Sequence, residues 1–289
     1  MRVPPVVAEK VARGLLMLAC ASAIAVLVFV IGFVMWGGFR HLSWGFLTQP
    51  ILDMGREGGI LPAIVGTLLM VLVAVGIAGP LGVASAIYLA EYTVEGRLTQ
   101  TIRFGINCLA GVPSIIFGLF GFILFVVMLG FGWSILSGGL SLSAMVLPTI
   151  IRTSEEAIRS VPRPFRDVAA SLGATRWQTV RRSVLPYALP GILTGIILGI
   201  GRSIEETAVV IFTAGSAVQM PRSLFDSART MAVHFYILAR EGISNEKAYA
   251  TAAVLICTIL VINISAYGIM HRMMRGRRAP SRSARGPAG

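Results

Sequence analysis

Three charged side chains lie within a segment of the sequence that is otherwise uncharged. They are Arg202, Glu205 and Glu206, and the rest of the segment 187–220 carries no charge. A charge in so apolar a segment costs several kcal/mol unless it faces a partner or a wet cavity, so the cluster is a candidate site for a polar solute. Arg202 precedes the glutamates by three and four residues, so an internal ion pair on one helix face is equally compatible with the spacing.

The composition indicates an integral membrane protein. Of 289 residues, 55% are hydrophobic and 13% are charged, whereas about a quarter of the residues of a soluble domain are charged. No phosphate-cradling loop with a Lys-Ser/Thr signature occurs, so the chain is predicted not to hydrolyse ATP and not to be an enzyme. The cysteines and histidines are scattered without ligand spacing, and no catalytic residue, metal site or cofactor site is predicted in this chain.

Six apolar segments are long enough to cross a hydrocarbon core of about 30 Å as helices. The chain is therefore predicted to be all-α and polytopic. No charge occurs between Arg103 and Arg152, and the Gly/Ser-rich stretch 130–141 should divide that region into two crossings. The predicted spans are 15–36, 60–90, these two crossings, 187–220 and 248–270.

Small residues recur in the first of those two crossings, at Gly111, Gly118 and Gly121, together with Pro113. Glycines allow helices to approach closely. A proline frees a backbone carbonyl that can line a cavity. Close packing and a pathway wall are both compatible with this pattern.

The basic residues predict the orientation of the chain. Of the 25 Lys and Arg residues, 18 lie in the N-terminal segment, the loop 91–103, the segment 152–186 and the C-terminal tail, and six lie in the opposite loops. The positive-inside tendency then makes the first group cytoplasmic. We expect a cytoplasmic N-terminus at 1–14, a six-helix domain at 15–271 and a basic cytoplasmic tail at 272–289, which is predicted to be disordered because it is rich in Arg, Pro, Ser and Gly.

The segment 164–186 is a basic amphipathic insert between two apolar spans. Pro164 suits the first turn of a helix, and Gly173 suits the left-handed residue that ends it. Thr175 and Gln178 have the spacing of a capping box that starts a second helix. The expected apolar stripes are Phe165, Val168, Ala169 and Leu172 on the first helix, and Trp177, Val180 and Val184 on the second.

Two short helices at an angle can serve three purposes. They could read DNA, rest on lipid headgroups or dock a partner protein. The membrane spans on both sides and the lack of a separate soluble core disfavour DNA, so no nucleic acid partner is predicted. Lipid and protein docking both remain open from the residues alone.

The insert resembles the EAA loop of ABC importer permeases. The resemblance rests on Asp167-Val168-Ala169, then Gly173, then Ser183-Val184-Leu185-Pro186 at the family spacing. Further similarity to phosphate-importer permeases of the PstA type lies in GGILPAIVGTLL (58–69), GVPSIIFGLFG (111–121), EEAIRSVP (155–162) and LPGILTGIILGIGRSIEET (189–207). The resemblance implies a type I (MetI-like) importer permease in the cytoplasmic, or inner, membrane.

The resemblance also implies partners and residue roles. In that family the loop seats a coupling helix in a groove of the ATPase, which here assigns ATPase coupling to Asp167, Ala169, Ala170, Gly173, Ala174 and Trp177. The implied partners are a homologous PstC-like permease, two PstB-like ATPase subunits that carry ATP and Mg, an extracytoplasmic PstS-like phosphate-binding protein, and the lipid membrane.

For the solute pathway, Arg202, Glu206 and Thr207 match an Arg and a Gly-Glu-Thr motif implicated in phosphate transport, and Glu205 replaces the family glycine. Ser114, in the shared segment 111–121, is assigned to the same pathway. The cluster has a net charge of −1 and would by itself repel an anion. Arg202 could nevertheless bind phosphate oxygens bidentately, while a carboxylate accepts the proton of a protonated phosphate.

Three other functions remain possible from the sequence. The chain could be a permease for another oxyanion or small solute, with Glu205 altering selectivity. It could be a secondary transporter in which Glu205 or Glu206 carries a coupling proton. It could also be a membrane scaffold or sensor, a role in which an Arg202→Gln change should be tolerated.

Overall fold

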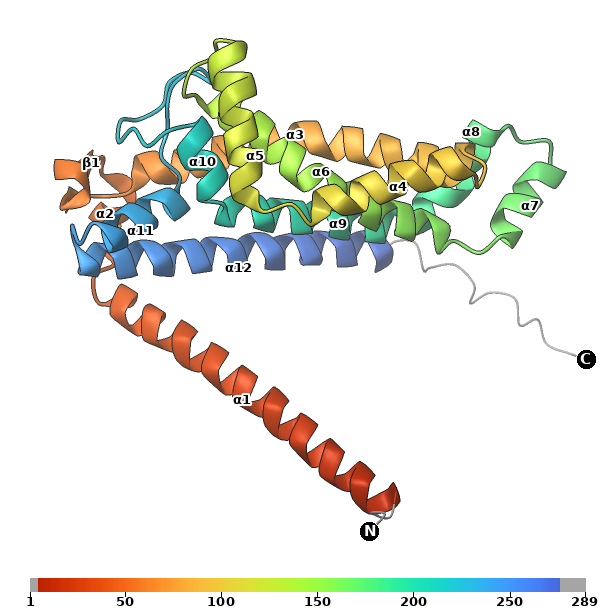
Figure 1. Cartoon of the computed structure of the whole chain (residues 1–289), viewed down its shortest axis with the longest axis horizontal. Coiled ribbons are helices and arrows are strands. Elements are labelled where there is room, and N and C mark those ends of the chain that lie inside the picture. The colour runs from red at the N-terminus through yellow and green to blue at the C-terminus, as the bar shows by residue number, and fades with distance from the viewer. Residues whose placement is uncertain (1–4, 276–289) are drawn as a thin grey trace, which may run out of the picture.

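The computed structural model describes residues 5–275 and is almost entirely helical (Figure 1). Within this range, five continuous helices are long and apolar enough to span a membrane: α1 (Pro5–Phe39), α3 (Leu61–Ile87), α6 (Ile135–Arg159), α9 (Leu185–Glu205) and α12 (Asn245–Arg275). Two further segments, α4 (Arg97–Ala110) and the helical stretch Ser114–Met128 that begins with α5 (Ser114–Gly121), meet at a bend of 97° and make a sixth span when they are counted as one. The predicted all-α, polytopic fold is confirmed, with six spans on that count.

Shorter elements connect these spans. A two-stranded antiparallel hairpin, β1 (Ile51–Leu52) and β2 (Glu57–Gly58), lies between α2 (Trp44–Thr48) and α3. The remaining short α-helices are α7 (Pro164–Ser171), α8 (Arg176–Thr179), α10 (Ala208–Thr213) and α11 (Met231–Arg240). A π-helical turn, Val180–Val184, joins α8 directly to α9.

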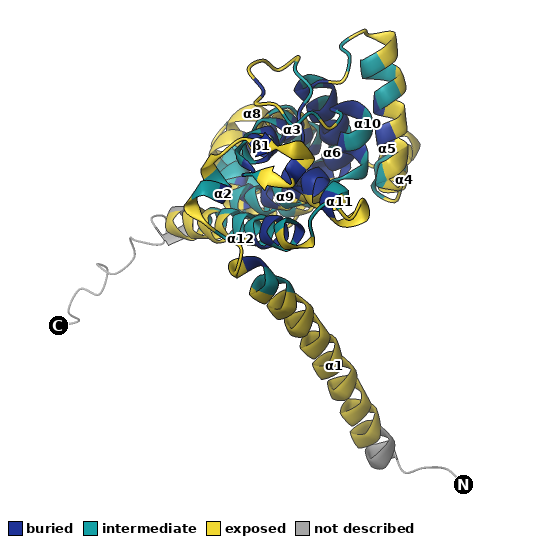
Figure 2. Cartoon of the chain, turned by 90° about the vertical axis from the view of Figure 1, so that its left-hand side faces the viewer, coloured by how far each residue is buried: buried dark blue, intermediate teal, exposed yellow. Residues whose placement is uncertain are grey.

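The core lies where α6 packs against α3 and α9 (Figure 2). Met70, Leu142, Val146 and Ile150 are fully buried there. In contrast, α1 diverges from the bundle, and its apolar window is 0% buried within the chain. It contacts α12 near its C-terminal end, where Phe33 meets Tyr249 edge to face. Such an apolar helix must be covered by lipid or by another protein.

The structure corrects the predicted bounds of two spans. The fifth was expected to continue to residue 220, but α9 ends at Glu205 and α10 is a separate helix. The third begins at Arg97, within the predicted water-exposed loop, and bends sharply at Gly111–Pro113. The bend follows from Pro113, because proline disfavours helical backbone in the preceding residue and lacks an N–H.

The structure describes the predicted termini in part. Residues 5–14 belong to α1, and 272–275 form the last turn of α12. The rest of the predicted tail, 276–289, lies outside the described residues.

Gly118 and Gly121 are sites of close helix packing. A Cβ added at Gly118 would lie 3.1 Å from the Val209 Cα atom, and one added at Gly121 would lie 2.0 Å from the Ser141 Oγ atom and 2.9 Å from the Thr213 Cγ2 atom. Both glycines therefore bring α5 against its neighbours, which favours the packing interpretation. A Cβ added at Gly111 would lie 3.5 Å from the Cys108 carbonyl oxygen, an ordinary contact distance, so this glycine is not required for close packing.

Gly121→Ala is expected to lower the free energy of unfolding by about 1–3 kcal/mol, because the added methyl group overpacks the junction of α5 with Ser141. Thermal unfolding in detergent would measure this loss. Gly76→Ala in α3 is the matched control, since a Cβ there meets nothing within 4 Å. Equal melting temperatures for the two variants would contradict the packing role.

A buried basic pair, Arg229 and His234, lies at the start of α11. Arg229 is 3% exposed and donates from Nε to the Ser216 carbonyl at 3.0 Å, while its Nη1 lies 3.3 Å from His234 Nδ1. Burial, reinforced by the charges of Arg229 and Lys247, lowers the pKa of His234 to about 3. His234 is therefore neutral in the folded protein at physiological pH.

His234 should make the folded protein sensitive to acid. In the unfolded chain this histidine binds a proton below about pH 6.5, whereas in the folded protein it binds one only near pH 3. The free energy of unfolding therefore decreases as the pH falls from 6.5 toward 3. Between about pH 7.5 and about pH 5, this loss amounts to about 2 kcal/mol. His234→Gln should reduce the measured loss by that amount, and His271→Gln, at an exposed histidine, should not. Identical pH dependence in both variants would refute the assignment.

Candidate functional site

The predicted pathway residues lie around one cavity of about 820 Å³, at the break between α9 and α10. Besides α9 and α10 on the two sides of the break, the helices α5, α6 and α12 contribute residues to the cavity lining. The cavity is lined by Ser114, Thr149, Ile197, Leu198, Gly201, Arg202, Glu205, Glu206, Thr207, Ala208, Asn263 and Tyr267. The structure thus brings together all five residues assigned to the pathway from the sequence.

Backbone groups at the end of α9 add to the polar lining of the cavity. Glu206 has extended backbone (φ −69°, ψ 129°) and ends α9, and Thr207 precedes α10. A broken helix leaves backbone carbonyl and amide groups without intrahelical partners. Such backbone is tolerated at membrane depth where it is buried in protein or lines a wet cavity. The break therefore supports a polar cavity at this point.

The charged side chains are arranged to face the cavity. Arg202 and Glu205 are exposed, and within the described part of the chain Arg202 has no carboxylate within 4 Å. Glu206 is half-buried, and the Ser114 side chain lies with it on the lining of the cavity. The internal ion pair that the spacing allowed is not formed. The guanidinium group is thus available to a solute.

Three uncharged polar residues of the cavity were missed from the sequence. Thr149 comes from α6, and Asn263 and Tyr267 come from α12. Asn263 carried a usable signal, because it is an amide side chain in the middle of an apolar span. Thr149 and Tyr267 carried none, since such residues are common in membrane helices and at their ends.

The insert 164–186 forms the predicted pair of short helices, which we call the elbow. Pro164 starts α7, and Gly173 follows it with φ +76°, a conformation that favours glycine. Thr175 and Gln178 make both hydrogen bonds of a capping box at the start of α8. These local predictions are confirmed. Of the predicted second stripe, Val180 and Val184 are buried, whereas Trp177 is 53% exposed because α8 projects beyond the bundle.

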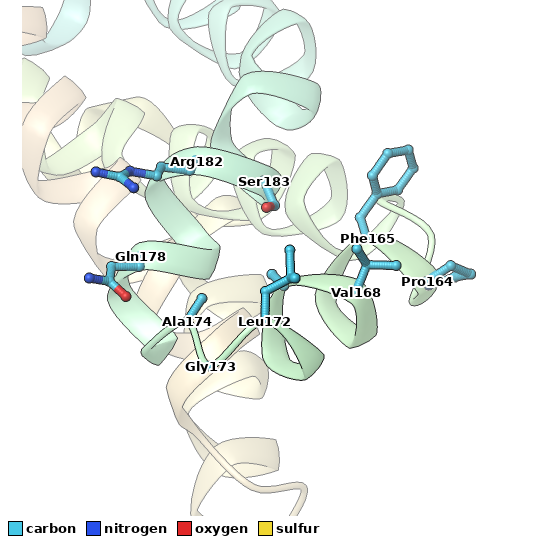
Figure 3. A pocket seen from close by; sticks show the side chains of 10 residues that line it. Pro164, Phe165, Val168, Leu172, Gly173, Ala174, Gln178, Arg182 and Ser183 are labelled. Atoms are coloured by element: carbon cyan, nitrogen blue, oxygen red, sulfur yellow. The ribbon is translucent and has the colours of Figure 1, made fainter.

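A groove of about 610 Å³ opens between the two arms of the elbow (Figure 3). Three of the residues assigned to coupling, Ala169, Gly173 and Ala174, line it. The other three, Asp167, Ala170 and Trp177, are exposed on the elbow outside the groove. The full lining is Pro164, Phe165, Val168, Ala169, Leu172, Gly173, Ala174, Gln178, Arg182 and Ser183. Exposed apolar side chains around a groove are typical of a protein-docking surface.

Comparison with known proteins identifies the family. The family described as binding-protein-dependent transport system inner membrane component matches residues 78–278, which include the cavity break and the elbow. The probable ABC transporter permease protein YqgI of Bacillus subtilis (strain 168) is 34% identical over 276 residues, covering 90% of this chain and 94% of that protein. Phosphate transport system permease protein PstA 1 of Mycobacterium tuberculosis (strain ATCC 25618 / H37Rv) is 34% identical over 240 residues, which cover 82% of this chain and 78% of that protein.

Solved structures have the same fold. A chain of the MetNI methionine ABC transporter, in an inward-facing conformation, superposes with a TM-score of 0.63 at 20% identity and covers 74% of this chain and 95% of its own. A chain of a bacterial ABC transporter involved in the import of the acidic polysaccharide alginate superposes with a TM-score of 0.65 at 17% identity. The match covers 92% of this chain and 98% of that chain. The chain therefore belongs to the family of inner membrane components of binding-protein-dependent transport systems and is a multi-pass permease subunit of an ABC importer.

Proposed function

We propose that this permease imports inorganic phosphate and that the cavity at the break between α9 and α10 is its half of the translocation pathway. The observation that carries the proposal is the convergence of Arg202, Glu206, Thr207 and Ser114 on one cavity. The similarity to permeases named for phosphate transport adds the substrate.

The chemistry of the cavity suits a protonated phosphate. Arg202 supplies a planar guanidinium group that can bind two oxygens at once. A carboxylate of Glu205 or Glu206 can accept a hydrogen bond from the P–OH group, which a fully deprotonated oxyanion lacks. The net charge of −1 then favours phosphate over sulfate, because sulfate would face the carboxylates without a proton to share.

The partners follow from the family and the exposed surfaces. A PstC-like permease supplies the other half of the pathway, and an extracytoplasmic PstS-like protein delivers phosphate. Two PstB-like ATPase subunits, which hold ATP and Mg, dock at the elbows of the two permeases. Both termini and the elbow are cytoplasmic. ATP binding closes the ATPase pair and moves the elbows, and the packed spans switch between outward and inward openings.

Reconstitution in liposomes with the neighbouring subunits tests the proposal. Phosphate with its binding protein should stimulate ATP hydrolysis and enter the liposomes, and sulfate should do neither. Glu205→Gly, which restores the glycine of the phosphate permeases, should retain phosphate transport. If phosphate stimulates ATP hydrolysis neither in the wild type nor in the Glu205→Gly variant, phosphate is ruled out as the substrate. Transport driven by a pH gradient without the ATPase would instead indicate a secondary transporter.

A further inference from the structure

One arginine joins the elbow to two membrane spans. Arg166, in the first turn of α7, donates from Nε and Nη2 to the Glu91 carboxylate, at 3.0 and 2.6 Å from its Oε1 atom. The same guanidinium group donates from Nη1 to the Val161 carbonyl at 2.6 Å and from Nη2 to the Ile158 carbonyl at 2.9 Å. Glu91 lies in the π-helical turn Tyr88–Tyr92 that continues α3, and Ile158 lies in the last turn of α6.

This contact is stronger than a surface ion pair. The side chain of Glu91 is 11% exposed and that of Arg166 is 24% exposed. Ion pairs in full solvent contribute little to stability. A two-pronged arginine–carboxylate contact that is shielded from water is both stronger and more fixed in direction. The same guanidinium group also donates to the carbonyls of Ile158, in the last turn of α6, and of Val161, just beyond it, so these hydrogen bonds together fix its direction.

The contact between α7 and the membrane spans is concentrated at the start of this helix. Phe165 packs on an apolar cluster formed by the ends of α3, α6 and α9, and its ring lies 4.3 Å from that of Tyr187. Farther along, the groove separates the apolar face of α7 from the π-helical turn that precedes α9. Phe165 and Arg166 thus attach α7, the arm of the elbow that is not continuous with α9, to the spans.

A second ionic cluster extends this connection to α4. Arg103 of α4 donates from Nε to Glu155 of α6 at 2.7 Å and also pairs with Glu95 at 2.9 Å. Glu95 in turn pairs with Arg159 at the end of α6. Arg103, in the middle of α4, thus ties that helix and the segment before it to the end of α6, and its Nη2 atom also donates to the Leu89 carbonyl, in the π-helical turn that continues α3, at 3.2 Å. On α6, Thr149 lies ten residues before Arg159, about 15 Å along the helix, and lines the solute cavity.

We propose that Arg166 and Glu91 form the link that transmits elbow movement to α3 and α6 and so couples ATP hydrolysis to opening of the solute cavity. They are positioning residues, because neither lines the cavity or the docking groove. This inference rests on the proposed function, in which the ATPase docks at the elbow. It identifies the side chains that carry the movement from that docking surface into the membrane.

The test measures phosphate imported per ATP hydrolysed, in liposomes that contain the complete transporter. Glu91→Gln and Arg166→Gln should each keep the ATPase subunits bound and hydrolysing ATP, while the ratio falls about tenfold. Because the two residues act through one contact, the double variant should be no worse than either single variant. Arg166→Lys, which retains the charge without the planar fork, should recover part of the ratio.

Arg163→Gln is the matched control, since Arg163 precedes the same helix and is exposed without an ion pair in the described residues. Its ratio should equal that of the wild type. Three outcomes would each overturn the link. The ratio of phosphate imported to ATP hydrolysed could stay unchanged in the Glu91 and Arg166 variants, or the effects of the two single variants could multiply in the double variant. The third outcome is loss of the ATPase subunits from the complex. Failure of phosphate to stimulate the wild-type complex would instead reject the proposed function.

Discussion

Replacing Arg202 with glutamine is expected to reduce phosphate uptake roughly 100-fold, because two charge-assisted hydrogen bonds to phosphate contribute about 3 kcal/mol or more. Arg202 lies at the cavity without a carboxylate within 4 Å in the part of the chain that the structure describes. Its loss therefore removes a contact to the solute and leaves no buried acid unpaired. Initial rates of phosphate uptake into liposomes would measure the effect.

Two further variants separate charge from geometry at this position. Arg202→Lys keeps the positive charge but loses the planar fork, so uptake should fall about tenfold. Arg56→Gln removes an equal charge from the exposed hairpin region outside the cavity and should leave uptake unchanged. Wild-type uptake by Arg202→Gln, with the transporter assembled, would exclude Arg202 from the pathway.

Leu172→Asp should prevent the ATPase subunits from co-purifying with the permease. The Leu172 side chain is 83% exposed and lines the elbow groove. An aspartate there would be buried without a partner once the ATPase docks, which costs several kcal/mol and weakens the complex by roughly 100-fold or more. Because the site is exposed in the permease alone, folding of the chain should be unaffected.

Ser171→Asp provides the matched control for the docking surface. Ser171 is the adjacent residue, is exposed and does not line the groove. It receives the same charge at nearly the same position in α7, so any general effect of acid at the end of this helix appears in both variants. Equal recovery of ATPase by the two variants would contradict docking in the groove.

Local features of the sequence predicted much of this structure. Continuous apolar segments predicted the spans, and the left-handed Gly173 and the Thr175–Gln178 capping box predicted the elbow. Those features depend on neighbouring residues, whose conformational preferences operate over a few positions. The break after Glu205 was missed, because the segment stays apolar to residue 220 and contains no proline there.

The amino-acid sequence is sufficient to predict that the chain crosses the membrane as helices, that one span carries charges and that a hinged insert lies between two spans. It did not predict that Thr149, Asn263 and Tyr267 join Arg202 at one cavity or that Arg166 reaches Glu91, which depend on how the helices pack. Packing is hard to read from hydropathy because lipid and neighbouring helices are both apolar. Hydropathy therefore shows that a helix is in the membrane but not which helix lies beside it, and packing of small and polar residues decides the neighbours.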